Sequence, residues 1–574
     1  MKKLNIRNGL LLCALAAGTF GFAQTRNPIS QQRKADIAPG QKLPVYKGTF
    51  NQTLKTVANA SLAAGISDGV DVRVFPTSNI QAEVTIAVNR SNPLNLLASA
   101  NTYVSTYNQG YYSSSDGGVT WSGADVLSGI SPSSVYGDPT VSFAADGTAF
   151  MTSINAGGGY WFQRSTNGGT VWSAAKRPDK GTGYDKGMSA SDDVSTSPYV
   201  NSFYHAWTDF NSGGGAVVLN RSANGGGTFA PTITLRSGAV GFGQGTCVQT
   251  GLNGEVYVCY ADHTSVVSPY AATGMGFVRS VDGGATFTPA TVIFPYSGTR
   301  VDYTYNTYNF TRVNDFPSMA VDKSSRFPGR IYIAYPEKNS VDGHSEIKVR
   351  FSNDQGATWS AAKVVNIPAA RQSFFPWITV DATNGVVMVA YYALDQATGY
   401  ATNTYVAVSL NGKKWLNQKV SDVSHITAPI NNGLFATGYA GDYIGIAASG
   451  GKAYPTWMDN RNGTWQVYCS PVTITLAALA DGQQEIAAIK PSASLPKVNK
   501  LTVEPNPFTS IIRLSLSNNN IRSVELFHQN GMLTKQWSNI SSGTLNVASV
   551  PKGTYIIKVT DKDNKVYTQT LIKE

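Results

Sequence analysis

One short motif recurs along the chain and constrains its fold more than any other feature. A Ser is followed by one residue, an Asp or Asn, one residue, a Gly, two residues and an aromatic residue. The copies are Ser114–Trp121, Ser165–Trp172, Ser222–Phe229, Ser280–Phe287 and Ser352–Trp359, with a version one residue shorter at Ser409–Trp415. The Asp or Asn can accept hydrogen bonds from its own turn, and the Gly adopts backbone angles that other residues avoid. The motif therefore predicts hairpin turns held by structural side chains. These side chains are Asp116, Asn167, Asn224, Asp282 and Asp354.

A second pair of apolar segments lies between successive motifs. Pro139–Phe143 is followed by Thr148–Thr152, and Pro317–Val321 is followed by Arg330–Tyr335. Each repeat thus reads as strand, hairpin, strand, loop, strand, motif turn and strand. Four-stranded antiparallel units that cannot bury both faces alone pack around a ring. The predicted fold is all-β, a β-propeller followed by a smaller β-sandwich.

Seven units can be counted. Their first strands are expected to begin near Glu83, Asp138, Lys186, Gly245, Phe316, Pro376 and Tyr443. The last unit has only three strands, and the segment 71–75 ahead of the first unit is a spare strand that can complete it. Six blades with an irregular extra sheet are the alternative.

The chain ends predict export and a separate tail. Residues 1–23 are basic and then apolar, end in small residues, and are expected to be a cleaved signal peptide. Residues 24–70 are assigned to a linker or pro-segment, 71–475 to the propeller and 476–497 to a second linker. Residues 498–574 hold five expected strands, at 511–516, 523–528, 543–547, 553–560 and 566–572, and are assigned to the sandwich.

Charge and cysteine content narrow the possible partners. The net charge is +10, but residues 71–475 hold 25 basic and 26 acidic side chains, so the excess lies at the ends. Nucleic-acid binding needs a concentrated basic face, and is therefore not expected. No segment after residue 23 has the apolar length of a membrane span. Cys247 and Cys259 flank a predicted hairpin, where they are either disulfide-bonded or buried as thiols.

The tail resembles a known sorting domain. The matching segments are Val503–Pro507, Val524–Gly531, Pro551–Ile556 and Leu571–Glu574. They are similar to the carboxy-terminal sorting domain of the type IX secretion system. The resemblance implies that the type IX machinery is a partner and that the protein is secreted or held on the outer cell surface.

The repeats resemble the Asp-box, or BNR, repeats of the sialidase superfamily. That family binds the substrate carboxylate with three Arg residues and uses an acid/base Asp and a Tyr activated by a Glu. Arg73 begins a segment one residue longer than the family's Arg-Ile-Pro, and Tyr439 matches the family's Tyr near the start of the last blade. The activating Glu has no match in the middle blade. The resemblance implies a glycan-directed protein with a sialidase-like fold.

Chain direction predicts where a site lies. The starts of first strands and the ends of second strands share the rim opposite the Asp boxes, around the central channel. The candidate catalytic residues on this rim are Glu83, Asp138, Asp315, Tyr439 and Asp442. The candidate substrate-binding residues are Arg73, Asp185, Arg312, Arg371 and Arg461. Further acids are Asp209, Asp262, Glu337 and Asp459, and neighbouring residues are Lys186, His205, His263, Trp207, Trp377, Tyr303, Tyr305 and Tyr308.

A carboxylate-lined pocket suits glycoside hydrolysis. Neighbouring carboxyl groups push their pKa values apart, which supplies one acid and one base. The glycoside hydrolase is therefore the leading hypothesis, and no cofactor is expected. A non-catalytic propeller that binds glycan or protein is one alternative. A polysaccharide lyase with Tyr303 beside Arg300 or Arg312 is another, and a Ca²⁺ site held by the acids is a third.

Overall fold

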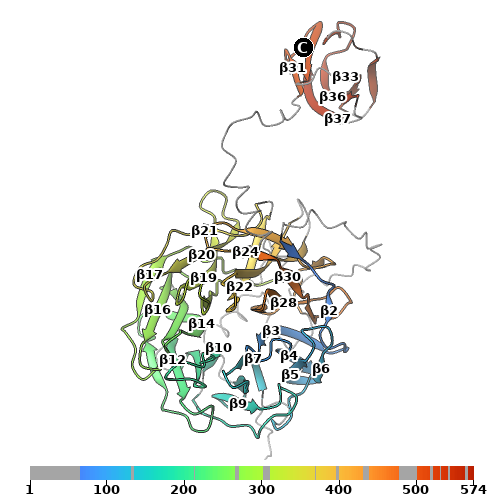
Figure 1. Ribbon diagram of the computed structural model, residues 1–574. Helices are drawn as coiled ribbons and strands as arrows, with labels where there is room; N and C mark the ends of the chain where they lie inside the picture. The colour runs from blue at the N-terminus through green and yellow to red at the C-terminus, as the bar shows by residue number, and fades with distance from the viewer. Residues whose placement is uncertain are drawn as a thin grey trace, which may run out of the picture. The chain divides into compact units, whose positions relative to one another are not determined.

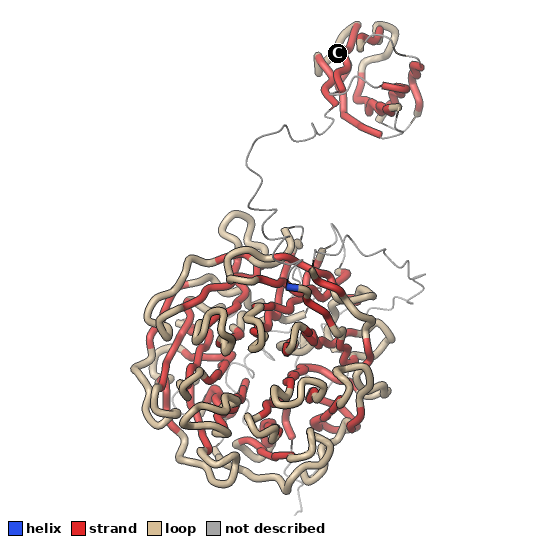
Figure 2. The backbone as a smooth tube through the Cα atoms, viewed as in Figure 1, coloured by secondary structure: helices blue, strands red, loops and turns tan. Residues whose placement is uncertain are grey.

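The computed structural model describes residues 65–476 and 501–574, apart from short stretches within them. These stretches are 131–134, 182, 212–213, 265–269, 302–310, 369, 396–399, 431–437, 517–520, 530–531, 539, 541–542 and 563–565. The chain divides into two compact units, 1–484 and 485–574, which are described separately. Every named element in the described residues is a strand. Figure 2 shows strands and loops, with a single very short helical stretch in blue. The fold is therefore all-β, as predicted.

Seven sheets follow one another along residues 65–476, here called the sheet ring. The first strands that carry a label in Figure 1 lie toward the centre, and the later strands of their sheets lie farther out. The first strands are β3 (Ile80–Val88), β7 (Val135–Phe143), β10 (Tyr184–Ser191), β14 (Phe242–Thr250), β18 (Ser318–Val321), β22 (Gln372–Val380) and β27 (Gly445–Ser449). Each first strand contacts the first strand of the next sheet, and β27 contacts β3, so the contacts run in a circle.

In the first six sheets the remaining strands pair outward in sequence order, whereas in the last sheet the second strand pairs with three others. The second strands are β4 (Leu96–Val104), β8 (Ala149–Asn155), β11 (Phe203–Asp209), β15 (Val256–His263), β19 (Ile331–Lys338), β23 (Val387–Leu394) and β28 (Lys452–Asp459). The third are β5 (Thr106–Ser114), β9 (Tyr160–Ser165), β12 (Ala216–Ser222), β16 (Gly274–Ser280), β20 (Ser345–Ser352), β24 (Ala401–Ser409) and β29 (Gln466–Cys469). The outer strands are β6 (Ser122–Ala124), β13 (Ile233–Arg236), β17 (Thr291–Pro295), β21 (Lys363–Val364) and β25 (Leu416–Lys419), while β26 (His425–Ile426) pairs with β24.

Five first strands contain a β-bulge near their start. The register shifts at 82–85, 137–140, 185–188, 244–247 and 374–377. A residue with left-handed backbone angles lies inside each bulge: Glu83, Asp138, Lys186, Gly245 and Phe375. The expected strand starts near these positions were therefore too late, because each strand continues through its bulge. A bulge redirects a side chain, and left-handed angles are uncommon outside Gly.

The last sheet is completed from the amino-terminal side. β2 (Val72–Arg73) pairs with β29, and β1 (Ile66–Ser67) pairs with β30 (Val472–Ile474). The pairing predicted for the spare strand is confirmed. The pairing also includes Ile66, which lies inside residues 24–70, the segment assigned to a linker or pro-segment. This junction is here called the seam.

Two acidic groups at the seam have raised pKa values. Burial raises the pKa of Asp68 to about 7, and burial raises that of Asp71 to about 6. A carboxyl group with a raised folded pKa adds stability that is complete below its unfolded pKa and is lost as the pH rises through the folded value.

We expect the unfolding free energy to fall between about pH 5 and pH 8, with part of this slope due to Asp68. Urea unfolding of the wild type and of Asp68→Asn at both pH values measures that part. The slope should be shallower in the variant. Equal slopes would contradict the assignment.

The carboxy-terminal unit consists of two sheets that share one core. One sheet contains β31 (Leu501–Glu504), β32 (Ile511–Leu516) and β35 (Thr544–Asn546). The other contains β33 (Ile521–His528), β34 (Leu533–Ser538), β36 (Gly553–Asp561) and β37 (Val566–Lys573). Ile512, Leu526 and Ile557 belong to the common buried cluster. Sequence analysis missed β31 and β34, which are short or mostly polar.

Candidate functional site

A small cavity lies where the first strands of several sheets converge. Its lining includes Lys186, Asn314, Trp377, Asp442 and Tyr443. Its volume is about 10 Å³, which is room for about one water molecule. It is called the channel cavity below. Most of the polar residues around it come from bulges and from loops that lead into first strands.

Three side chains from neighbouring bulges meet beside this cavity. The Asp138 carboxylate lies close enough to Glu83 for its charge to add to the effect of burial, which raises the pKa of Glu83. The Lys186 backbone N–H donates to Asp138 Oδ2 at 2.6 Å, and Lys186 Nζ lies 3.9 Å from Asp138 Oδ1. All three side chains are buried. The bulges thus bring two carboxyl groups and one ammonium group into contact away from bulk water.

The Lys186 ammonium group lies against aromatic rings. Its Nζ is 3.3 Å from the ring centroid of Tyr443 and 5.2 Å from that of Phe316. Among the described residues it has no hydrogen-bond partner. A buried ammonium group can donate three hydrogen bonds, so Lys186 presents unused donors at the cavity.

Arg312 and Asp442 form an ion pair at the edge of the cavity. Arg312 Nη2 donates to Asp442 Oδ2 at 2.7 Å, and both side chains are less than one-fifth exposed. Asn314 Nδ2 donates to the Asp442 backbone oxygen at 2.7 Å. The guanidinium carbon of Arg312 lies 5.2 Å from the ring centroid of Tyr439.

Asn101 connects Tyr439 to Glu83. Its Nδ2 donates to Glu83 Oε2 at 2.5 Å and to the Tyr439 hydroxyl at 3.2 Å. The Glu83 carboxyl group also raises the pKa of Tyr439, after the larger effect of burial. Tyr439 therefore does have a neighbouring Glu, but this residue comes from the first sheet, where sequence analysis did not pair the two.

Asp185 lies beside the same group. Gln244 Nε2 donates to Asp185 Oδ2 at 2.5 Å, and Arg300 Nη1 donates to Gln244 Oε1 at 2.8 Å. Burial, together with the charges of Asp138 and Asp442, raises the pKa of Asp185 to about 6. The channel cluster is defined as Glu83, Asp138, Asp185, Lys186, Arg312, Tyr439 and Asp442.

The carboxyl groups of the channel cluster have widely separated pKa values. Burial raises the pKa of Glu83 well above its usual range and raises that of Asp138. Asp442 is also desolvated, but the charges of Arg312 and Lys186 lower its pKa to about 2. Burial therefore favours the protonated form of Glu83, whereas the charges of Arg312 and Lys186 favour the ionised form of Asp442. Such a separation assigns an acid and a base within one site.

Four of the predicted site residues lie outside the channel cluster. Two of them, Asp315 and Arg73, bind residues that do not belong to it. Asp315 Oδ2 accepts from the Ala272 backbone N–H at 2.7 Å, and its Oδ1 lies 3.9 Å from His263 Nε2. Arg73 donates to Gln466 at 2.7 Å, in the seam.

Arg461 also belongs to the seam, where Nη1 and Nη2 lie 2.6 Å from Asp71 Oδ2 and Asp459 Oδ2. Arg371 lies just before β22, where its backbone N–H donates to Leu394. Nearness to a strand end, on which the rim prediction rested, does not decide which way a side chain turns.

The other acids and histidines named from the sequence make local contacts. Asp262 pairs with Arg236, and Glu337 pairs with Lys348. Burial lowers the pKa of His205 to about 3. His263 stacks on Phe242 and its pKa is lowered to about 4, again chiefly by burial. Tyr303, Tyr305 and Tyr308 lie outside the described residues.

The Asp-box side chains bind within their own turns. Ser280 Oγ donates to Asp282 Oδ1 at 2.7 Å, and the Thr286 backbone N–H donates to the same oxygen at 2.9 Å. These Ser280 and Thr286 donors lower the pKa of Asp282 to about 2. The equivalent Ser hydroxyl donates to Asp116, Asn167, Asn224 and Asp354.

Sequence analysis missed Asn101, Gln244 and Asn314. Each is an amide that joins two members of the channel cluster or binds one of them. An amide in a strand carries no sequence signal of its own. Gln244, however, directly precedes a bulge in a first strand, and Asn314 lies shortly before the start of another first strand. That position is the signal that would have found them.

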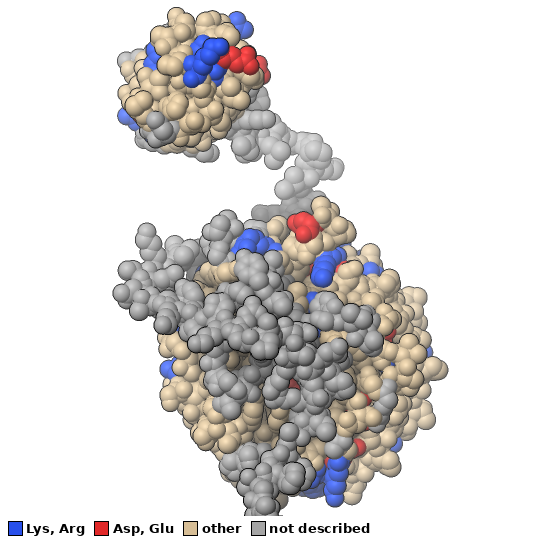
Figure 3. Space-filling view, turned by 180° about the vertical axis from the view of Figure 1, so that it is seen from behind, with Lys and Arg blue, Asp and Glu red and all other residues tan. Residues whose placement is uncertain are grey.

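The described residues offer no grouped metal ligands and no membrane-spanning helix. No three His, Cys, Asp or Glu side chains among them are grouped as metal ligands, so the calcium alternative gains no support there. No described helix is long and apolar enough to cross a membrane. Cys247 and Cys259 face each other across β14 and β15 as free, buried thiols. Figure 3 shows that most of the visible described surface is uncharged.

The tail matches a known family. Residues 502–574 match the model described as the secretion system C-terminal sorting domain. This confirms the resemblance noted from the tail motifs, and it indicates type IX secretion to the cell surface or the exterior. A comparison with curated proteins found no match.

Several solved structures resemble the chain at low identity. The α-L-arabinofuranosidase Arb93A of Fusarium graminearum is 11% identical with a TM-score of 0.38, over 60% of this chain and 94% of that chain. An ulvan lyase of polysaccharide lyase family PL25 is 10% identical with a TM-score of 0.39, over 71% and 94%. The leech intramolecular trans-sialidase is 12% identical with a TM-score of 0.35, over 70% and 69%.

Proposed function

We propose that the sheet ring is a seven-bladed propeller of the sialidase superfamily and that the protein is an exported glycoside hydrolase acting at the channel cluster. The observation that supports this most strongly is the opposite direction of two carboxyl pKa shifts in one buried group: burial raises the pKa of Glu83, whereas the charges of Arg312 and Lys186 lower that of Asp442. Glycoside hydrolysis uses such a pair. The sorting tail fits a substrate found outside the cell.

Five members of the channel cluster have a role in this proposal. Glu83 is the general acid that protonates the leaving oxygen. Asp442 is the ionised carboxylate that acts as base or stabilises positive charge on the sugar ring. Tyr439 is the alternative nucleophile, since Asn101 holds its hydroxyl near Glu83. Arg312 and Lys186 bind the substrate and keep Asp442 ionised.

The proposed substrate class is broader than sialosides. A sialic acid carboxylate is bound by three Arg residues in sialidases, whereas only Arg312 of the four predicted Arg residues belongs to the cluster. A sugar ring also needs more room than the 10 Å³ cavity. Substrate entry therefore requires the loops at this rim to move.

The substrate can be identified with purified full-length protein. We expect release of reducing sugar from at least one polymer or oligosaccharide in a panel of neutral glycosides, sialosides and uronate polymers. Unsaturated products from the uronate polymers would instead assign the lyase alternative. Absence of turnover across the panel, with glycan binding retained, would contradict the enzyme and favour the non-catalytic propeller.

A further inference from the structure

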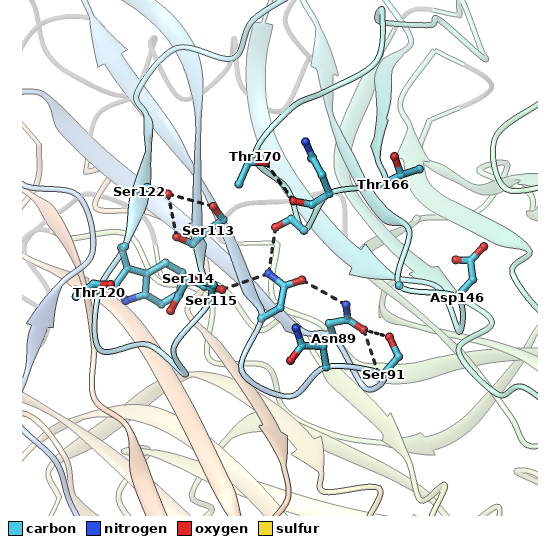
Figure 4. Close-up of a pocket in the computed structure, with 16 residues that line it drawn as sticks. Asn89, Ser91, Ser113, Ser114, Ser115, Thr120, Ser122, Asp146, Thr166 and Thr170 are labelled. Atoms are coloured by element: carbon cyan, nitrogen blue, oxygen red, sulfur yellow. Dashed lines mark hydrogen bonds between the residues drawn. The ribbon is translucent and has the colours of Figure 1, made fainter.

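A larger cavity lies on the opposite rim, between the first and second sheets. Its volume is about 410 Å³, within the range of small-molecule sites, and it is here called the rim groove. Its walls are the Asp-box hairpin at 113–122, the next hairpin at 166–170, and the loops at 89–95 and 146–147. Figure 4 shows Ser113 and Ser122 on one side of it and Asp146 on the other.

Two buried amides build the floor of the rim groove. Asn95 Nδ2 donates to the backbone oxygens of Ser114 at 3.2 Å and Gly168 at 3.1 Å, which joins the two hairpins. Asn89 Nδ2 donates to Asn95 Oδ1 at 3.3 Å, and Asn89 Oδ1 accepts from Ser91 Oγ at 2.7 Å. The floor is therefore fixed before any ligand arrives, which lowers the entropic cost of binding.

The walls present unused polar groups and one aromatic ring. Within the described part of the chain, no hydrogen bond occupies the exposed side chains of Asn92, Ser115 or Thr166. Trp121 lines the groove half-buried, and its Nε1 donates to the Gly118 oxygen at 3.1 Å, which fixes the ring. Hydroxyl and amide groups beside a fixed aromatic ring suit a ligand with many hydroxyls and one apolar face.

The charge of the lining restricts the ligand further. Among the described residues that line the rim groove there is no Lys or Arg, and Asp146 is the one acidic residue. A sialic acid or uronic acid would bring a carboxylate toward Asp146 with no cation to offset it. A neutral sugar meets no such repulsion, and its hydroxyls can donate to the Asp146 carboxylate.

We propose that the rim groove is a second glycan site, which binds a neutral mono- or disaccharide unit without cleaving it. It lies on the Asp-box rim, away from the channel cluster. A polymer held there would stay close to the protein while the opposite rim acts on another part of it. The site does not depend on the channel cluster being catalytic.

Saturation-transfer NMR and calorimetry on the full-length protein test this proposal. The probes are the neutral disaccharides cellobiose, maltose, lactose, mannobiose, xylobiose and α-1,4-galactobiose, with α-1,4-digalacturonate as the acidic counterpart of the last. We expect at least one neutral disaccharide to bind and digalacturonate not to bind. Failure of all the neutral probes, or tighter binding of digalacturonate, would overturn the proposal.

Variants locate the binding. The triple change Asn92→Ala, Ser115→Ala and Thr166→Ala should weaken it about tenfold or more, because three exposed hydrogen-bonding groups are lost. Trp121→Ala should abolish it. Trp359→Ala is the matched control, since Trp359 holds the same place in another Asp box and donates to Gly356 at 3.1 Å.

The Trp359→Ala control should bind the neutral disaccharide with the same affinity as the wild type. Binding that survives both the triple change and Trp121→Ala would overturn the site. Glu83→Gln should not change the affinity, so loss of hydrolysis and loss of rim binding are separable.

Discussion

Glu83→Gln is expected to lower the kcat of glycan hydrolysis by about 10²–10⁴-fold, because the amide keeps the size and the hydrogen bond but has no proton to transfer. The Asn101 amide can still donate to the carbonyl oxygen of the substituted side chain, so KM should change little. Steady-state kinetics on the substrate found in the panel measures both constants.

The pH dependence of the activity gives a second prediction from the assignment of Glu83 as the general acid. Burial raises the pKa of Glu83, so the acid form persists above the usual pH range of a carboxyl group, and activity falls as the pH rises through that pKa. The pKa of Asp442 is about 2, so its base form persists into the acid range. Glu83→Gln should remove the alkaline fall. Asp282→Asn is the control, since Asn already occupies the equivalent Asp-box position at Asn167 and Asn224. Wild-type kcat in Glu83→Gln would contradict the acid role.

Arg461→Met is expected to cost about 3–5 kcal/mol of unfolding free energy, because it leaves two buried carboxylates without their partner. Arg461 lies 2.6 Å from both Asp71 and Asp459, and the three side chains are less than one-tenth exposed. Asp71 belongs to the amino-terminal strand segment and Asp459 to β28, so the loss acts on the seam itself. Urea unfolding at about neutral pH measures it.

The control for this change is Arg90→Met. Arg90 pairs with Asp193 at 3.2 Å, with 31% and 20% of the two side chains exposed, so its loss should cost less than about 1 kcal/mol. Arg461→Lys keeps the charge and should recover part of the stability even if Arg461→Met does not fold. Equal unfolding free energies of Arg461→Met and the wild type would show that the stability of the seam does not depend on the ion pairs of Arg461.

The sequence predicted the all-β class and the order of strands because hairpin turns and alternation are local signals. The motif around Asp282 contains all the donors and acceptors of its turn within eight residues, so no distant part of the chain is needed to explain it. The completion of the last sheet by Val72 was also predictable, since an unpaired strand and an incomplete sheet imply each other.

The site was only partly predictable because bulges and side-chain directions depend on tertiary packing. Glu83, Asp138, Asp442 and Arg312 were expected at one rim, and the structure brings them together. Asp315 also precedes a first strand but accepts a hydrogen bond from Ala272, and Arg461 pairs with Asp71 in the seam. A strand start gives a residue's level along the channel, whereas its side-chain direction is set by bulges that have no local signal in the sequence.

The most direct test of the account measures the protonation of Glu83 itself. Infrared spectroscopy at about pH 8, above the pKa values of Asp68 and Asp185, detects the carbonyl band of a protonated carboxyl group. We predict this band in the wild type and in Asp282→Asn, and its loss in Glu83→Gln. No protonated carboxyl band in the wild type, or the same band in Glu83→Gln, would contradict the assignment of an acid in the channel cluster.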